Sequence, residues 1–222
     1  PRRSGQTQQD GLRFATGLRN AVALAVDPGT GSVFAAQHGR DQLAEHWPKL
    51  YNDTASAELP AEVVFRLAAG GDYGWPYCYY DWRRRQTVLQ PEYGGDGKTV
   101  GRCESTPRPV VAFPGHWAPE GMAFYNGRRF PTKYRGGLFI AFHGSWNRAP
   151  QPQAGYKVVF VPIARGAASG AAEVFADGFA GQEMTPGGAH YRPMGLAVGP
   201  DGSLYVTSDQ APGAVFRIVS QP

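Results

Sequence analysis

The sequence predicts an all-β fold, a β-propeller built from four-stranded blades, and three observations lead to this expectation. The chain has 30 Gly and 19 Pro among 222 residues, which is above average usage but below that of low-complexity sequence. No stretch keeps a helical hydrophobic period over twelve residues. A short apolar run, a turn rich in Asp, Gly, Asn or Pro, and a second apolar run recur in that order three times. Many short antiparallel strands are therefore expected.

The three repeats are predicted to be hairpins. Their first strands are expected at 22–26, 121–125 and 194–198, and their second strands at 32–35, 137–141 and 203–207. Asp27-Pro28-Gly29 forms the first predicted turn, Asn126-Gly127 lies in the second, and Gly199-Pro200-Asp201-Gly202 forms the third. Each of these short segments is typical of a tight turn between strands.

Further strands are expected at 62–67, 110–113, 156–161, 172–176 and 214–219. Four-stranded units that recur in this way are typical of propeller blades, and the similar turn chemistry favours this arrangement over a β-sandwich. About three blades fit in the chain, whereas a ring needs at least four to close. We therefore expect residues 1–222 to be half of one propeller domain, which is completed by a missing half or a second copy.

Two segments, 41–59 and 70–107, are too long to be hairpin turns. Both carry aromatic residues, and long loops on a rigid scaffold are common places for binding sites. The alternative is that they are ordered lids that only cover blade edges.

Charge and hydropathy exclude several classes of function. The formal net charge is +4, but the basic residues are scattered and the densest cluster, Arg83-Arg84-Arg85, is three residues long. No basic helical face or RNA-binding motif is present, so we expect no nucleic acid partner. No run of eighteen apolar residues exists, so no membrane span is predicted.

The two cysteines, Cys78 and Cys103, do not have the spacing of a metal site. A disulfide is favoured over two buried free thiols. Such a loop closure would contribute about 3 kcal/mol through the unfolded state. A disulfide would also place the protein in an oxidising compartment, which is the periplasm or the extracellular space.

Several motifs in order resemble those of a known family. They are Gly17-Leu18-Arg19-Asn20, Gln37-His38-Gly39-Arg40-Asp41, Gly70-Gly71-Asp72-Tyr73-Gly74-Trp75-Pro76 and Tyr191-Arg192-Pro193-Met194-Gly195-Leu196. The chain resembles the soluble sugar dehydrogenases that use pyrroloquinoline quinone (PQQ). The segments 77–79, 118–125 and 142–148 are similar to the sorbosone dehydrogenase-like branch. The resemblance extends from about residue 17 to residue 218, and it implies a six-bladed propeller with a cofactor over the central channel.

The resemblance also implies roles for particular residues. Arg19 with Asn20 would contact the quinone, and Arg192 would hold one of its carboxylates, because arginine binds a carboxylate through two donors. His190 stands where relatives can have a second arginine. Trp117 would form a wall of the sugar site.

A calcium ion is expected at the segment after the second strand. By resemblance its ligands would be the carbonyl oxygens of Gly39 and Arg40 and the side chain of Gln37, and calcium accepts such neutral oxygens readily. Relatives commonly have proline where this chain has Arg40. Some relatives have a second calcium site that uses an Asp-Glu pair. We do not expect that site here, because the pair appears as Ala61-Glu62.

The general base of these dehydrogenases is a histidine of the N-terminal half, and none of the five histidines here has the matching context. We therefore expect a parent enzyme that oxidises an aldose or sugar aldehyde and passes electrons to an external acceptor, with this chain alone inactive. A binding or interaction propeller without the chemistry is the alternative. A calcium-dependent lactonase-type hydrolase is a third reading, for which Asn20, Asp41 and Asp209 are the candidate ligands.

Overall fold

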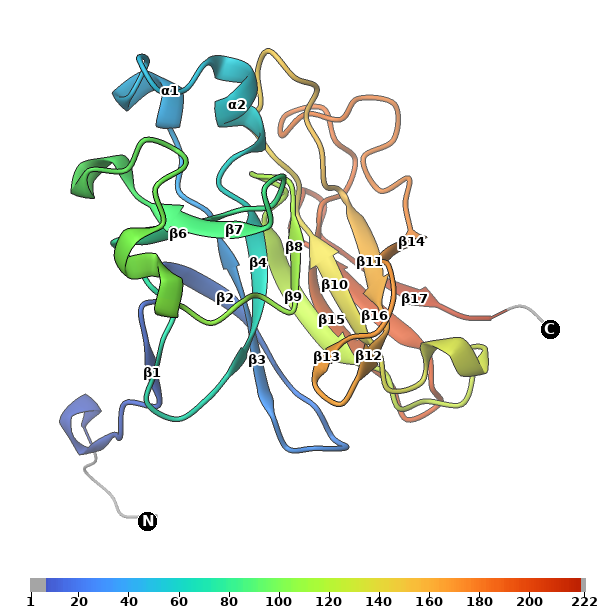
Figure 1. Ribbon diagram of the computed structural model, residues 1–222. Coiled ribbons are helices and arrows are strands. Elements are labelled where there is room, and N and C mark those ends of the chain that lie inside the picture. Colours follow the sequence, from blue (N-terminus) through green and yellow to red (C-terminus); the bar gives the residue numbers. More distant parts are fainter. Residues whose placement is uncertain (1–6, 221–222) are drawn as a thin grey trace.

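The computed structural model describes residues 7–220 and has the expected mostly β architecture. Three antiparallel sheets follow one another along the chain, and long loops gather at one end of them (Figure 1). Every strand predicted from the sequence is found. The largest boundary difference is in the second strand of the first hairpin, which continues to His38.

The first sheet has the strand order β2-β3-β4-β8. These strands are β2 (Asn20–Val26), β3 (Val33–His38), β4 (Glu62–Leu67) and β8 (Val111–Phe113). Asp27 closes the turn between β2 and β3, because its carboxylate accepts hydrogen bonds from the backbone of Gly29 and the hydroxyl of Thr30. This local bonding explains why an Asp-Pro-Gly turn follows the strand.

The second sheet repeats the pattern with the order β9-β10-β11-β14. Its strands are β9 (Pro119–Phe124), β10 (Leu138–Phe142), β11 (Lys157–Val161) and β14 (Glu173–Ala176). The third sheet contains β15 (Pro193–Val198), β16 (Leu204–Ser208) and β17 (Ala214–Ile218), and no fourth strand joins it within residues 7–220.

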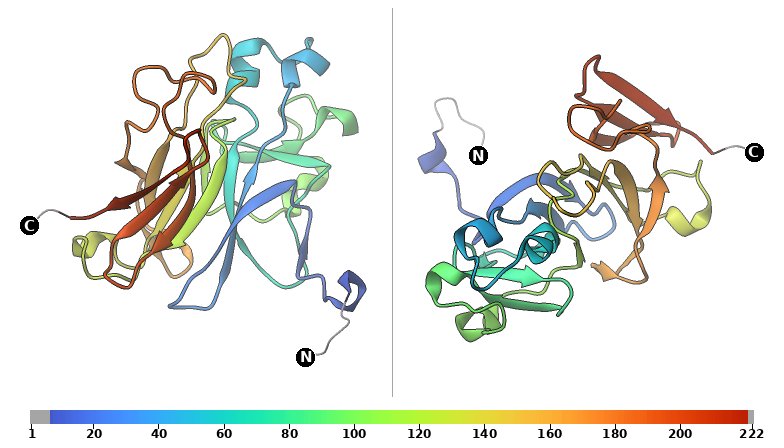
Figure 2. Two further views of the ribbon diagram at one scale, coloured as in Figure 1. Left: turned by 180° about the vertical axis from the view of Figure 1, so that it is seen from behind. Right: turned by 90° about the horizontal axis from the view of Figure 1, so that it is seen from above.

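The first strands of the three sheets lie next to one another. β9 packs beside β2 on one side and beside β15 on the other. The sheets fan out from these strands, as the view from above shows (Figure 2). This is the arrangement of neighbouring propeller blades, and the sheets form no closed ring in the described part of the chain.

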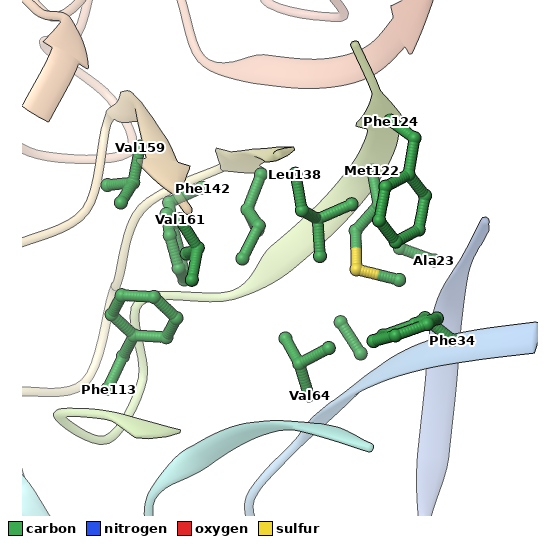
Figure 3. Close-up of a cluster of buried hydrophobic side chains, with 12 residues drawn as sticks. Ala23, Phe34, Val64, Phe113, Met122, Phe124, Leu138, Phe142, Val159 and Val161 are labelled. Carbon is green, nitrogen blue, oxygen red and sulfur yellow. The ribbon is translucent and has the colours of Figure 1, made fainter. Parts of the chain in front are cut away.

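The central strand β10 is buried on both faces, and its side chains alternate between two cores. Leu138, Ile140 and Phe142 point towards the first sheet and pack with Phe34 and Val64 (Figure 3). Period-two alternation along a strand produces this division. The second sheet is thereby held between its two neighbours.

The second core joins the second and third sheets. Phe139 and Ala141 of β10 pack there against Leu204 and Val206 of β16. The hydroxyl of Tyr125 ties the same two sheets together by donating to the carbonyl oxygen of Gly202, at 2.8 Å. The two cores therefore fix three blades in one body.

The two insertions fold against each other. α1 (Leu43–His46) and α2 (Asp53–Glu58) come from the first insertion, and the hairpin β6 (Cys78–Asp81) and β7 (Gln86–Leu89) comes from the second. They share a small core, in which the hydroxyls of Tyr51 and Tyr79 are 2.8 Å apart. The insertions are thus an ordered layer on the blades.

The predicted disulfide is confirmed. Cys78 and Cys103 are bonded, with their Cα atoms 5.8 Å apart. The bond ties β6 to a short 3-10 helix within the second insertion. The remaining short elements are β1 (Ala15–Thr16), β5 (Gly71–Asp72), β12 (Ile163–Ala164), β13 (Ala167–Ala168) and 3-10 helices at Gln8–Asp10, Pro91–Tyr93, Gly101–Ser105 and Thr132–Tyr134.

Candidate cofactor site

Arg19 stands immediately before β2 and is held by the adjacent strand. Its backbone N–H donates to Oε1 of Gln37 at 2.9 Å. Its guanidinium donates from Nη1 to the carbonyl oxygen of Gly39 at 2.5 Å, and its Cζ lies 5.7 Å from the centre of the Trp75 ring. The side chain of Arg19 therefore reaches the loop that follows β3.

The loop after β3 requires glycine at position 39. A Cβ there would lie 2.8 Å from the carbonyl oxygen of Pro60, which is closer than side-chain carbons approach. The N–H of Gly39 donates to Oε2 of Glu62 at 3.2 Å. Glycine thus lets the loop backbone pack closely on the chain that leads into β4.

Glu62 is a buried carboxyl group beneath this loop. It is 2% exposed, and its Oε1 also accepts the backbone N–H of His116 at 2.7 Å. Burial raises the pKa of Glu62 to about 8, although the two backbone donors act in the opposite direction. One side chain therefore fixes the Gly39 loop and the 115–118 loop to each other.

Arg40 turns away from Arg19 and towards the second insertion. Its guanidinium donates to the carboxylate of Glu92 and, at 3.4 Å, to Oε1 of Gln90. A cavity of about 360 Å³ opens beside Arg40 and Arg19, and Trp75 forms part of its wall. The side chain of Arg40 thus anchors the insertion at the edge of the site.

Asp41 joins three loops of the rim. Its Oδ1 lies 3.1 Å from Nδ1 of His116 and accepts from Nδ2 of Asn147 at 2.9 Å, while its Oδ2 is 3.6 Å from Arg19. The hydrogen bond from His116 is the main reason that the pKa of Asp41 is below its usual range. Nε2 of His116 lies 2.8 Å from the carbonyl oxygen of Ser56, so the imidazole also contacts α2.

Arg192 reaches the same rim from the third sheet. Its Nε donates to the carbonyl oxygen of His143 at 3.2 Å, and Nη2 donates to that of Gly144 at 2.7 Å. The backbone N–H of Arg192 is fixed by the hydroxyl of Ser208 at 2.9 Å. The guanidinium has no carboxylate partner among residues 7–220.

The loop 143–148 connects the two arginines. Arg192 donates to the backbone at the start of this loop, and Asn147 near its end reaches Asp41, which in turn lies beside Arg19. Arg148 anchors the loop from below by donating to the carbonyl oxygens of Ala57, at 2.6 Å, and Gly115, at 2.8 Å. The structure thus brings both arginines to one rim.

The other residues expected at the site do not share in the contacts that join Arg19 and Arg192. Asn20 is exposed at the start of β2, opposite His38. His190 is exposed, and its ring lies against the backbone of Gly181. Trp117 packs half-buried against the core, with Nζ of Lys157 at 5.2 Å from the ring centre, and its buried indole N–H has no partner in the described part of the chain.

Several residues of the rim were not predicted from the sequence to act there. They include Glu62 and Asn147. His143 is a third, and its Nε2 lies 2.8 Å from Oδ1 of Asp209, which was named only as a candidate ligand under the hydrolase reading. Glu120 also belongs to this set, because its carboxylate is 3.7 Å from Nε2 of His38. Glu120 is the second residue of the inner strand β9, and the only sequence signal for it is its place directly before the predicted apolar run at 121–125. The others depend on contacts between distant segments.

Comparison with known proteins shows the relationship that these features suggested. Residues 2–221 match the TrAA12-like family. The chain belongs to the TrAA12-like family. Among curated relatives of this TrAA12-like chain, a PQQ-dependent pyranose dehydrogenase of Coprinopsis cinerea is 30% identical over 250 residues, covering 96% of the chain and 33% of the relative. An uncharacterized protein of Borreliella burgdorferi is 29% identical, covering 88% of the chain and 45% of the relative.

Solved structures agree with the TrAA12-like fold. The calcium structure of a Trichoderma reesei family AA12 enzyme superposes with a TM-score of 0.76 at 21% identity, covering 96% of the chain and 55% of that structure. A PQQ-bound aldose sugar dehydrogenase of Streptomyces coelicolor superposes with a TM-score of 0.54 at 17% identity. The match covers 97% of the chain and 47% of that structure. The resemblance to PQQ-dependent sugar dehydrogenases is therefore confirmed, and the fold is that of these proteins.

The TrAA12-like chain spans less than half the length of the curated relatives it matches. Within residues 7–220 no helix has the length and apolar character needed to cross a membrane. No cluster of three or more His, Cys, Asp or Glu side chains able to hold a metal occurs among those residues. The calcium site expected here consists instead of backbone and amide oxygens.

Proposed function

We propose that the whole protein is a PQQ-dependent oxidoreductase that oxidises an aldose or a sugar aldehyde. The observation that carries this proposal is the guanidinium of Arg192, which is fixed on two backbone carbonyl oxygens at the rim and lacks a carboxylate partner in the described residues. A tricarboxylated cofactor supplies that partner. The family relationship points to the same chemistry.

The residues present fit a carboxylated quinone. Arg19 and Arg192 stand at the ends of two inner strands, and both are held by backbone carbonyls that orient their remaining donors. When bound, PQQ accepts a hydride from the sugar carbon. The side chains of this chain bind and orient the cofactor, with Asn20 and His190 as further contacts and Trp117 as a wall for the sugar. The base that removes the hydroxyl proton is expected outside this segment.

Calcium binding at Gly39, Arg40 and Gln37 is coupled to the cofactor in this proposal. Arg19 already donates to the Gly39 oxygen and to Oε1 of Gln37. A guanidinium and a divalent cation repel each other at one carbonyl, so Arg19 has to leave the Gly39 oxygen before calcium binds there. A cofactor carboxylate offers Arg19 another partner, and we therefore expect calcium to bind much more tightly in the presence of PQQ.

The disulfide supports a location in the periplasm or outside the cell, where such bonds persist. An external electron acceptor would be the further partner of the whole protein.

Activity of the whole protein tests this proposal. We expect the protein expressed from its whole coding sequence, loaded with PQQ and calcium, to reduce an artificial dye when aldoses are added. The 222-residue chain alone gives no turnover. Calorimetric titration of PQQ with and without calcium measures the coupling separately. A whole protein that folds but binds no PQQ contradicts the proposal.

A binding propeller without redox chemistry is the second candidate. The contact of Arg19 with the Gly39 oxygen favours it, because that contact uses an expected calcium ligand. The two candidate functions predict different effects of PQQ on calcium affinity. A binding module shows no gain in calcium affinity when PQQ is added, and sugar binding then persists without dye reduction.

A further inference from the structure

A second cavity lies in the disulfide-linked insertion. Its volume is about 320 Å³, which is in the range of small-ligand pockets. The wall includes two arginines, Arg85 and Arg108, which approach from different segments. Tyr80 and Thr87 of the β6–β7 hairpin complete one side.

Neither arginine has an ion-pair partner among the described residues. Within residues 7–220 the guanidinium groups of Arg85 and Arg108 form no ion pair, hydrogen bond or aromatic contact. Both act on the Tyr80 hydroxyl, whose pKa is raised mainly by burial and lowered by these two arginines. The two positive charges therefore face one space without a direct ion-pair partner.

The segments that carry the two arginines are fixed. Oδ1 of Asp81 accepts the backbone N–H groups of Arg83, at 2.9 Å, and Arg84, at 3.1 Å, which locks the turn just before Arg85. Arg108 follows Thr106, whose hydroxyl donates to the carbonyl oxygen of Cys103 at 2.7 Å, and Cys103 is held by the disulfide. Fixed backbones reduce the entropy lost when the side chains close on a ligand.

We propose that Arg85 and Arg108 form a binding site for a small oxyanion that carries two or more negative charges on carboxylate or phosphate groups. Each guanidinium can bind one such group through two parallel hydrogen bonds. The hydroxyls of Tyr80 and Thr87 are further donors. The bound anion removes the repulsion between the two arginines.

The site is distinct from the cofactor rim. Arg19 and Gly39 line another, smaller cavity of about 30 Å³, and Tyr80, Thr87 and Thr106 lie between the two cavities. An oxyanion at Arg85 and Arg108 is therefore bound behind the cofactor loop. The proposal does not depend on the redox function.

Glu104 also lines the cavity, and its negative charge allows the direction of a mutational effect to be predicted. Its carboxylate opposes an anion, although it forms no ion pair with either arginine among the described residues. Removal of this charge is therefore expected to strengthen binding. A surface patch that only attracts anions weakly and diffusely would respond to every nearby charge alike.

The experiment uses the protein expressed from its whole coding sequence, with citrate and inorganic phosphate as separate probes in calorimetric titrations. We expect saturable binding of at least one probe, and Arg85→Gln or Arg108→Gln should each weaken it about tenfold. Glu104→Gln should tighten it. Arg84→Gln, which removes an exposed charge outside the cavity, is the matched control and should change affinity less than about twofold.

The two probes distinguish the chemical sources. Binding of citrate alone identifies a carboxylate ligand, and binding of phosphate alone identifies a phosphate ligand. The proposal is overturned if neither probe saturates below about 10 mM, or if Arg84→Gln weakens binding as much as Arg85→Gln. Circular dichroism of each variant verifies that the fold is retained.

Discussion

Arg192 shows how a single side chain at the rim is prepared for a ligand. Its backbone is held by Ser208, and two carbonyl oxygens of the 143–148 loop direct its guanidinium. The sequence indicates such a residue through its place before an inner strand and through its motif. The sequence does not reveal that the partners are backbone oxygens, because these come from a loop far along the chain.

Replacement of Arg192 tests its proposed role. We expect Arg192→Ala in the whole protein to weaken PQQ binding by about 2 to 4 kcal/mol, because a desolvated carboxylate loses its partner. Arg192→Lys keeps the charge but loses the two-donor geometry, so its affinity for PQQ should lie between that of Arg192→Ala and that of the native protein. Fluorescence titration with PQQ measures both. Equal affinity of all three proteins would remove Arg192 from the site.

Glu62 predicts a dependence of stability on pH. The folded-state pKa of about 8 lies above the ordinary value of 4.5. Between these two values the folded protein holds a proton that the unfolded chain has released, so stability is fully present at low pH and is lost as pH rises towards 8. The free energy of unfolding should fall by about 1 kcal/mol per pH unit across this window.

Urea unfolding at several pH values measures this slope. Glu62→Gln should be less stable overall, since its amide cannot accept both backbone N–H groups, but its slope should be nearly flat. An unchanged slope in the variant would assign the pH dependence to other groups.

Among the elements, the blade strands and the positions of the two insertions were predictable, but the helices and the hairpin inside the insertions were not. Hairpins such as β2–β3 follow from local signals, because Asp27 bonds to the turn that it begins and apolar residues alternate along each strand. The helices α1 and α2 have 4 and 6 residues, too few to show a period. Their order depends on distant contacts such as that between Tyr51 and Tyr79.

The disulfide is expected to hold the second insertion together. Replacement of both Cys78 and Cys103 by serine should lower the free energy of unfolding by about 3 kcal/mol, since the bond closes a loop with a sequence separation of 25. Urea unfolding of the variant measures the loss. The native protein in excess reductant is the control and should show a similar loss, whereas unchanged stability in both would mean that the shared insertion core is sufficient.

For the whole molecule, the decisive feature is that two blades have an open face. Val22, Leu24 and Val26 project from the outer side of β2 and are 44%, 63% and 58% exposed, and Val215 of β17 at the other end is 68% exposed. The second sheet, by contrast, is buried on both faces. An apolar flank of this kind is expected to pair with another blade.

We therefore expect the isolated 222-residue chain to self-associate. Leu24→Ser should weaken association about tenfold, since burial of a leucine contributes about 1.5 to 3 kcal/mol. Sedimentation velocity over a range of concentrations measures this. Val174→Ser, at an exposed position on the outer strand β14, is the matched control, and an equal effect of both changes would argue against a specific contact at β2.

By itself the sequence determined the hairpins, their order, the disulfide and the family, because turn chemistry, strand alternation and motif spacing are properties of short segments. Tertiary structure alone decided that the guanidinium of Arg19 donates to the carbonyl oxygen of Gly39, which is 20 residues away in the sequence. It alone decided that Glu62 accepts the N–H of His116, 54 residues away, and so joins two loops. It also decided that Arg85 and Arg108 face one cavity. These arrangements depend on packing between blades and insertions, which brings together groups whose separation along the chain carries no local signal.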